Sequence, residues 1–95
     1  MARNVRRTTW RVDVDGRPHE VVLNWTYWGG KREVVLDGDV VAKQRKPLLW
    51  WSEQAFRVDG QACRVVTRAQ KANTLEFDAE LFVGDTLVRA QSDTR

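Results

Sequence analysis

The sequence predicts an all-β fold, either an antiparallel β-sandwich or a partly closed barrel of about eight strands arranged as four successive hairpins. Three observations favour it: recurrent turn dipeptides, apolar residues that alternate with a period of two, and the lack of any segment of ten or more residues with a helical period. Aspartate–glycine pairs supply the positive φ angles that tight hairpin turns need. The four turn pairs are Asp15-Gly16, Asp37-Gly38, Asp59-Gly60 and Gly84-Asp85, and their glycines lie 22, 22 and 24 residues apart.

Alternation assigns faces to the strands of the first hairpin. Charged Arg11 and Asp13 separate apolar residues in its first strand, so one face is expected to be buried and the other wet. The second strand is expected to carry a matching apolar face. The inward residues predicted for this hairpin are Trp10, Val12, Val14, Val21, Leu23 and Trp25.

The second hairpin, near Arg32–Leu36 and Asp39–Lys43, is rich in valine at both phases, so the pattern leaves its faces ambiguous. The third and fourth hairpins alternate more clearly. The inward residues expected there are Phe56, Val58, Cys63 and Val65, followed by Leu75, Phe77, Ala79, Leu81 and Val83. Strands with one apolar face each would leave that face wet in an open layer, and this predicts that the sheet folds over into a sandwich or barrel.

The chain is sized for one domain, with 95 residues, 42% of them hydrophobic and 31% charged. We expect a β-sandwich domain over residues 8–91, a basic N-terminal tail over residues 1–7 and a C-terminal tail over residues 92–95. No uncharged apolar run is long enough to cross a bilayer, and the arginine-rich start is not typical of a secretory leader. These features predict a soluble, cytoplasmic protein with no membrane partner.

Positive charge is concentrated in the first half of the chain. Residues 1–46 contain ten basic and six acidic residues, whereas residues 47–95 contain six basic and seven acidic ones. Either basic cluster could meet phosphate or an acidic protein surface, although a solvated tail and a charged loop explain the same pattern. The clusters are Arg3, Arg6, Arg7 and Arg11, and then Lys43, Arg45 and Lys46.

Candidate catalytic residues are few. His19 is the only histidine, and its place after Pro18 predicts a turn residue. Cys63 is the only cysteine, so it forms no internal disulfide and no thiolate metal site, and its inward phase predicts a small buried filler. The sequence therefore predicts no enzymatic activity, no catalytic residue, no cofactor, no metal site and no small-molecule substrate.

Aromatic residues near strand boundaries offer a candidate binding surface. Five tryptophans are many for this length, and an accessible tryptophan is typical of protein interface hot spots because it buries a large apolar area. The same rings could instead close the ends of the sandwich. The predicted partner-binding residues are Tyr27, Trp28, Arg45, Lys46, Trp50 and Trp51.

Turn glycines and apolar positions recur in a recognisable order along nearly the whole chain, from Thr8 to Ala90. They are Trp10, Asp15-Gly16, Val21, Leu23, Lys31-Arg32, Val34-Val35, Asp37-Gly38, Phe56–Gly60, Cys63 and Leu81–Gly84. This order resembles the Fas apoptotic inhibitory molecule family, which has two similar sandwich-like all-β domains, and this chain is long enough for one. The resemblance implies a non-enzymatic protein that acts through protein contacts, in apoptosis regulation or in restraining aggregation.

Two functional hypotheses follow. The first is a protein-interaction module whose aromatic patch, flanked by Arg45 and Lys46, contacts a partner or a second copy of the chain. The alternative is a single-stranded nucleic-acid binder in which bases stack on the same rings and arginines follow the backbone. The second predicts affinity that falls steeply with salt.

Overall fold

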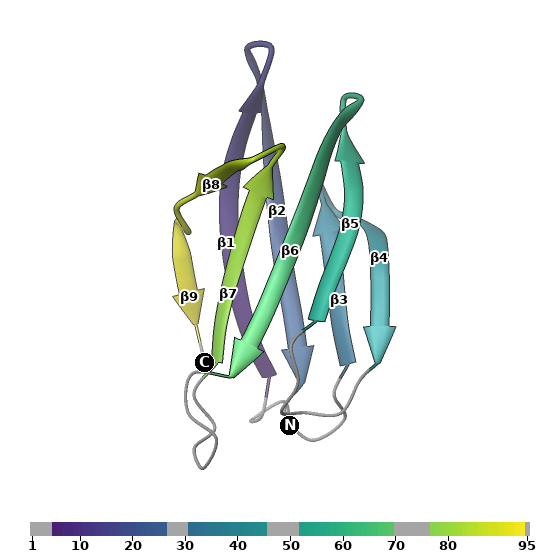
Figure 1. Ribbon diagram of the computed structural model, residues 1–95, viewed down its shortest axis with the longest axis vertical. Helices are drawn as coiled ribbons and strands as arrows, with labels where there is room; N and C mark the ends of the chain where they lie inside the picture. Colours follow the sequence, from purple (N-terminus) through teal and green to yellow (C-terminus); the bar gives the residue numbers. More distant parts are fainter. Residues whose placement is uncertain (1–4, 27–30, 46–51, 70–76, 95) are drawn as a thin grey trace.

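The computed structural model describes residues 5–26, 31–45, 52–69 and 77–94, which form nine β-strands (Figure 1). The all-β prediction is confirmed. The strands are β1 (Val5–Val14), β2 (Arg17–Thr26), β3 (Lys31–Leu36), β4 (Asp39–Arg45), β5 (Ser52–Val58), β6 (Gln61–Ala69), β7 (Phe77–Val83), β8 (Thr86–Val88) and β9 (Ser92–Thr94).

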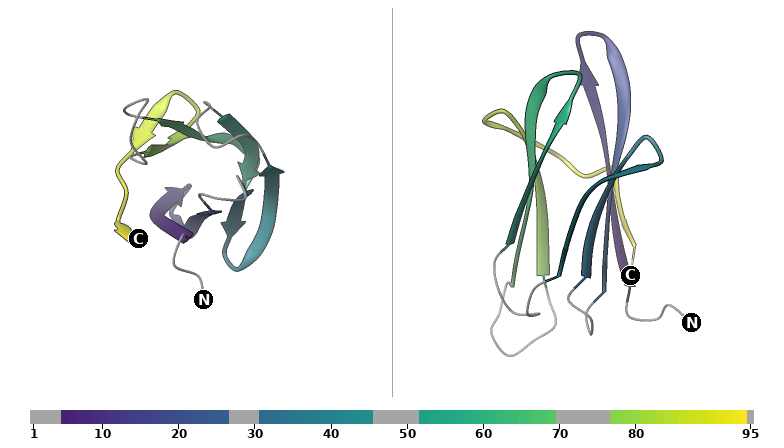
Figure 2. Two further views of the ribbon diagram at one scale, coloured as in Figure 1. Left: turned by 90° about the horizontal axis from the view of Figure 1, so that it is seen from below. Right: turned by 90° about the vertical axis from the view of Figure 1, so that its right-hand side faces the viewer.

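Two antiparallel sheets face each other as the layers of a sandwich (Figure 2). The first sheet has the order β4-β3-β2-β1-β9, and the second has the order β5-β6-β7-β8. The chain crosses between sheets after β4, returns after β8, and otherwise runs through neighbouring strands. The two sheets are not closed into a barrel, which decides between the two architectures that the sequence allowed.

All four predicted hairpins are present, and their turns lie at one end of the molecule (Figure 1). The turn aspartates Asp15, Asp37 and Asp59 adopt φ angles of 51°, 49° and 47°, and the glycine after each is also left-handed. Aspartate tolerates this region because its side chain bonds locally, and glycine because it has no Cβ. We call this end the turn end, and the opposite end, where β2, β4 and β6 finish, the loop end.

The expected inward residues of the first and third hairpins are buried, as predicted. Trp10, Leu23 and Trp25 pack with the valines of both sheets into one core. In the fourth hairpin Leu81 is fully buried and Ala79 and Val83 pack against the core. The buried apolar residues are Trp10, Val12, Val14, Val21, Leu23, Trp25, Val34, Phe56, Val58, Cys63, Val65, Val66 and Leu81.

The core is apolar toward the turn end and polar toward the loop end. Along β1 the inward positions change from Trp10, Val12 and Val14 to Thr8 and Arg6 as the strand is followed toward the loop end. The same change occurs along the inward faces of β3, β5 and β6, whereas β2 keeps apolar Trp25 near its loop end. The buried polar residues are Arg6, Thr8, Arg32, Ser52, Gln54 and Thr67.

The second hairpin, whose faces the sequence left ambiguous, contains a β-bulge. Val34 pairs with Ala42 and Val35 pairs with Val40, so Val41 is an extra residue in β4. Val34 is buried, whereas Val40 and Val41 are exposed. Because a bulge interrupts the two-residue alternation, no single phase could have assigned both strands of this hairpin.

Strands extend into both segments that we expected to be tails. β1 begins at Val5, and Arg6, which we placed in the basic tail, is buried. β9 pairs with β1 through backbone contacts and adds a ninth strand, and Gln91 N–H donates to the Thr9 carbonyl at 2.7 Å beside it. Backbone pairing leaves no hydrophobic pattern, which explains why the sequence did not predict this strand. The described residues form no helix that could span a membrane.

Candidate functional site

One of the six predicted partner-binding residues lies among the described residues. Arg45 is exposed at the loop end of β4. The other five, Tyr27, Trp28, Lys46, Trp50 and Trp51, lie outside the described residues. Four strands flank these residues. The last residues of β2 and β4 and the first residues of β3 and β5 lie toward the loop end (Figure 1).

Arg45 belongs to a basic corner, made of Lys31, Lys43 and Arg45, on the outer face of the first sheet. Lys31 pairs directly with Arg45 across β3 and β4, so two like charges are opposite each other. Glu33 offsets part of this charge, with its Oε2 at 3.6 Å from Lys31 Nζ and 4.0 Å from Lys43 Nζ. The three basic residues and Gln44 line a shallow hollow of about 300 Å³.

β4, which carries two members of the basic corner, is an edge strand. Among the described strands only β3 pairs with it, and β5, which contacts it from the other sheet, pairs with β6 instead. Val40 is 53% exposed and Val41 is 39% exposed. Together with exposed Leu87 they are the large hydrophobic residues that the described part of the chain presents to solvent.

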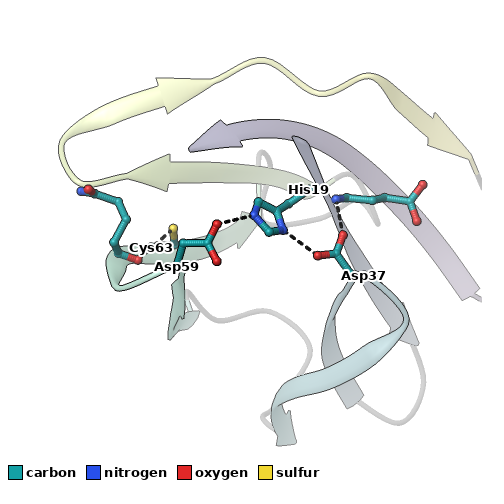
Figure 3. A network of polar contacts seen from close by, with 6 residues as sticks. His19, Asp37, Asp59 and Cys63 are labelled. Atoms are coloured by element: carbon teal, nitrogen blue, oxygen red, sulfur yellow. Dashed lines mark hydrogen bonds and ion pairs between the residues drawn. The ribbon is translucent and has the colours of Figure 1, made fainter. Parts of the chain in front are cut away.

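A second cluster lies at the turn end, where His19 is held between two turn aspartates (Figure 3). Its Nδ1 is 2.6 Å from Asp37 Oδ2 and its Nε2 is 2.7 Å from Asp59 Oδ2. Asp37 belongs to the β3–β4 turn of the same sheet, and Asp59 belongs to the β5–β6 turn of the other sheet. The histidine therefore links the two layers, and we call this group the His19 clasp.

The two carboxylates change the acidity of the clasp. Hydrogen bonds that the ring donates to Asp37 and then to Asp59 raise the pKa of His19 above its usual 6.5. The His19 ring and then the Glu20 backbone N–H, which donates to Asp37 Oδ1 at 2.8 Å, lower the pKa of Asp37 below its usual 3.8. Both shifts favour the charged form of the group concerned.

The prediction that His19 is a turn residue is wrong. It lies within β2, opposite Val12, and has the same phase as the inward residues Val21 and Leu23. Its place on the inward phase, two residues before Val21, was the feature of the sequence that could have indicated a strand position. The aspartate partners had no signal of their own, because an Asp-Gly pair is explained by its turn geometry alone.

Cys63 is buried, as the sequence predicts. Burial raises the pKa of its thiol, and its Sγ–H donates to the Gln61 carbonyl at 3.5 Å. A thiol held in its protonated form is a poor nucleophile. Among the described residues no group of three or more histidine, cysteine, aspartate or glutamate side chains is arranged to hold a metal ion.

Four of the buried polar residues of the loop end form a connected network across the two sheets: Arg32, Ser52, Gln54 and Thr67. Arg32, which is 1% exposed, donates from Nε to Thr67 Oγ1 at 3.1 Å, and Thr67 is hydrogen-bonded to Ser52. Gln54 donates from Nε2 to the Arg32 carbonyl at 3.3 Å. Arg6 stacks its guanidinium on Trp25, 5.1 Å from the ring centroid. Burial lowers the pKa of Arg32 by desolvation.

Comparison with protein-family models found no match to this chain, and neither the curated proteins nor the solved structures gave one. The resemblance to the Fas apoptotic inhibitory molecule family therefore stays a prediction.

Proposed function

We propose that this chain is a non-enzymatic protein-interaction domain that binds an acidic, extended segment of another protein along the outer edge of β4. The observation that carries the proposal is that the edge strand β4 has two exposed valines and two of the three residues of the basic corner. An extended segment can add to such an edge as a further strand, with backbone hydrogen bonds for affinity and alternate side chains for specificity.

Charge favours an acidic segment. Arg45 and Lys31 are like charges in a directly paired position, and Glu33 faces Lys43. A carboxylate placed beside Arg45 and Lys43 on the open side of β4 would offset the repulsion and extend the alternation of charge across the sheet. A second copy of β4 would instead bring further basic residues to this corner.

Two observations support a non-enzymatic role. Both ring nitrogens of His19 are bound to carboxylates, which leaves neither free to act as a general base. The pKa of the Cys63 thiol is raised. The proposal also includes the anti-apoptotic or anti-aggregation role that the family resemblance implies. It further includes a contribution to partner binding from Tyr27, Trp28, Lys46, Trp50 and Trp51.

Fluorescence anisotropy with a labelled nine-residue peptide of alternating valine and glutamate tests the proposal. We expect saturable binding that weakens with added salt, because the contacts at the basic corner are exposed. The same peptide with N-methyl groups on alternate backbone nitrogens should lose binding, since it can no longer pair with β4. A peptide of alternating valine and lysine should not bind.

The variant Lys43→Glu/Arg45→Glu should weaken binding of the acidic peptide by at least about tenfold, which corresponds to about 1.4 kcal/mol. It should also gain binding of the lysine peptide. The matched control Arg17→Glu/Arg89→Glu makes the same change of net charge at exposed positions away from β4 and should change affinity little. Preferential binding of a ten-residue oligothymidylate would favour the nucleic-acid alternative, and concentration-dependent dimers in light scattering would favour self-association; either result would contradict the proposal.

A further inference from the structure

The His19 clasp joins three elements that are distant in the sequence. His19 is on β2, Asp37 is 18 residues later in the β3–β4 turn, and Asp59 is 40 residues later in the β5–β6 turn. Figure 3 shows the ring between the two carboxylates, with one ring nitrogen facing each. The contact to Asp37 stays within the first sheet, whereas the contact to Asp59 crosses to the second sheet.

Hydrogen-bonding rules fix the protonation state that this geometry requires. An ionised carboxylate only accepts hydrogen bonds, and a neutral imidazole has one N–H and one lone pair. With carboxylate oxygens at 2.6 Å and 2.7 Å from its two nitrogens, His19 satisfies both contacts only as an imidazolium. In the neutral ring, whichever nitrogen loses its proton would direct a lone pair at a carboxylate oxygen.

We propose that the His19 clasp is a proton-operated latch that fixes the β5–β6 turn of one sheet to β2 of the other and releases that turn when the imidazolium loses a proton. The latch covers the apolar half of the core, because Val58, directly before Asp59, is completely buried and Val12, opposite His19, is buried as well. Release therefore loosens the turn end of the sandwich and leaves the polar network of the loop end in place.

The two arms of the latch differ in strength. Asp37 is held to β2 independently of the ring, because Glu20 N–H donates to its side chain at 2.8 Å and its own N–H donates to the Glu20 carbonyl at 2.9 Å. Among the described residues, His19 is the partner that the side chain of Asp59 contacts. Loss of the ring proton should therefore displace the Asp59 turn more than the Asp37 turn.

The charged groups around the ring come from every element packed against it. Asp37 and Asp59 contact it directly, and Glu20, next to it on β2, and Arg11 on β1 line the same shallow hollow. Gln91, on the segment before β9, is uncharged. Two bound carboxylates outweigh one neighbouring guanidinium that forms no hydrogen bond with the ring, so the surroundings favour the imidazolium.

NMR titration of the unmodified protein tests the latch, with the His19 ring protons and the backbone amides of the three Asp-Gly turns followed from pH 5 to pH 9. The His19 midpoint should lie above 6.5, and the amide signals of Asp59 and Gly60 should shift with the same midpoint and the largest amplitude. The Asp15-Gly16 turn has the same backbone conformation without a histidine contact and is an internal control that should not follow. An Asp59-Gly60 signal that does not follow the His19 midpoint would overturn the proposal.

Variants separate the latch from a general surface charge effect. Asp59→Asn should bring the His19 midpoint down toward 6.5 and make exchange of the Gly60 and Gln61 amides at pH 6 several-fold faster. Asp15→Asn removes a carboxylate from the matching turn of the first hairpin and should do neither. Equal effects of the two variants would show that net charge alone acts on His19, and would also overturn the latch.

Discussion

The two halves of the core between the sheets differ in the polarity of their buried side chains. Toward the turn end, the inward positions are mainly apolar, with valine, leucine and phenylalanine, and the His19 clasp adds a polar contact between the sheets. Toward the loop end, positions of the same phase on β1, β3, β5 and β6 hold hydroxyl, amide and guanidinium groups, and some of these bond across the sheets, as Arg32 does with Thr67. Backbone alternation decides which side chains are buried, whereas their polarity decides whether burial is favourable by itself or requires partners.

This difference has an energetic consequence. Each apolar side chain contributes through the area that it removes from water. Truncating one therefore lowers the free energy of unfolding in proportion to the apolar area lost. A buried guanidinium contributes only while its hydrogen bonds are made, because unpaired it costs the full desolvation of a charge. The loop-end half should therefore be more sensitive to the loss of single polar atoms than to changes of volume.

Leu81→Ala should have the largest effect. Leu81 is 0% exposed in the apolar half, and replacing a buried leucine by alanine removes about 2–5 kcal/mol from the free energy of unfolding. Leu87→Ala is the matched control, because Leu87 belongs to the other strand of the same hairpin and is 54% exposed; its effect should stay within about 0.5 kcal/mol. Urea denaturation followed by tryptophan fluorescence measures both. Equal losses of unfolding free energy in the two variants would show that apolar burial does not dominate the stability of the turn-end half.

Thr67→Val should have the next largest effect, although it changes the side-chain volume little. The hydroxyl accepts a hydrogen bond from Arg32 and is bonded to Ser52, so its removal leaves buried polar groups unpaired, at a cost of about 1–3 kcal/mol. Thr67→Ser keeps the hydroxyl, and denaturation should show it to be the more stable of the two variants. If Thr67→Val leaves the free energy of unfolding unchanged, the polar network is dispensable and the two halves of the core do not differ in their dependence on hydrogen bonds.

A smaller effect is expected from pH, through the His19 clasp. Because the pKa of His19 is raised in the folded state, the stability it contributes is fully present below pH 6.5 and is lost as the pH rises through the folded value. Because the pKa of Asp37 is lowered, its contribution is present above pH 3.8 and is lost as the pH falls through its folded value. Urea midpoints measured from pH 5 to pH 9 should decline at the alkaline end in the unmodified protein and in Asp15→Asn. The decline should be weaker in His19→Gln, and a decline of the same size there would assign it to other groups.

The smallest effect on stability is expected for Trp50→Ser/Trp51→Ser. The β-type circular dichroism should stay intact while binding of the acidic peptide weakens, because the sequence predicts both residues to be part of the partner-binding patch. Loss of the folded signal would instead place both rings in the core and extend the apolar half toward the loop end.

The sequence predicted the fold wherever turn chemistry and alternation agreed. Asp15-Gly16 and Asp59-Gly60, with the apolar phases on either side of them, were sufficient for the first and third hairpins. It did not predict the burial of Arg6 or Arg32, because a charged residue on an inward phase resembles the end of a strand until its partners in the other sheet are known. His19 was missed for the same reason, since the residues that bind it are 18 and 40 positions away.

The bulge at Val41 limits how the edge of β4 can be used. An uninterrupted edge strand would template one copy after another into a ribbon of indefinite length, which is the first step toward fibrils. An extra residue breaks the regular spacing of backbone donors and acceptors and twists the strand locally. We therefore expect the bulge to disfavour the stacking of β4 edges from successive copies of the chain, which is in keeping with the proposal that this edge binds a single extended segment.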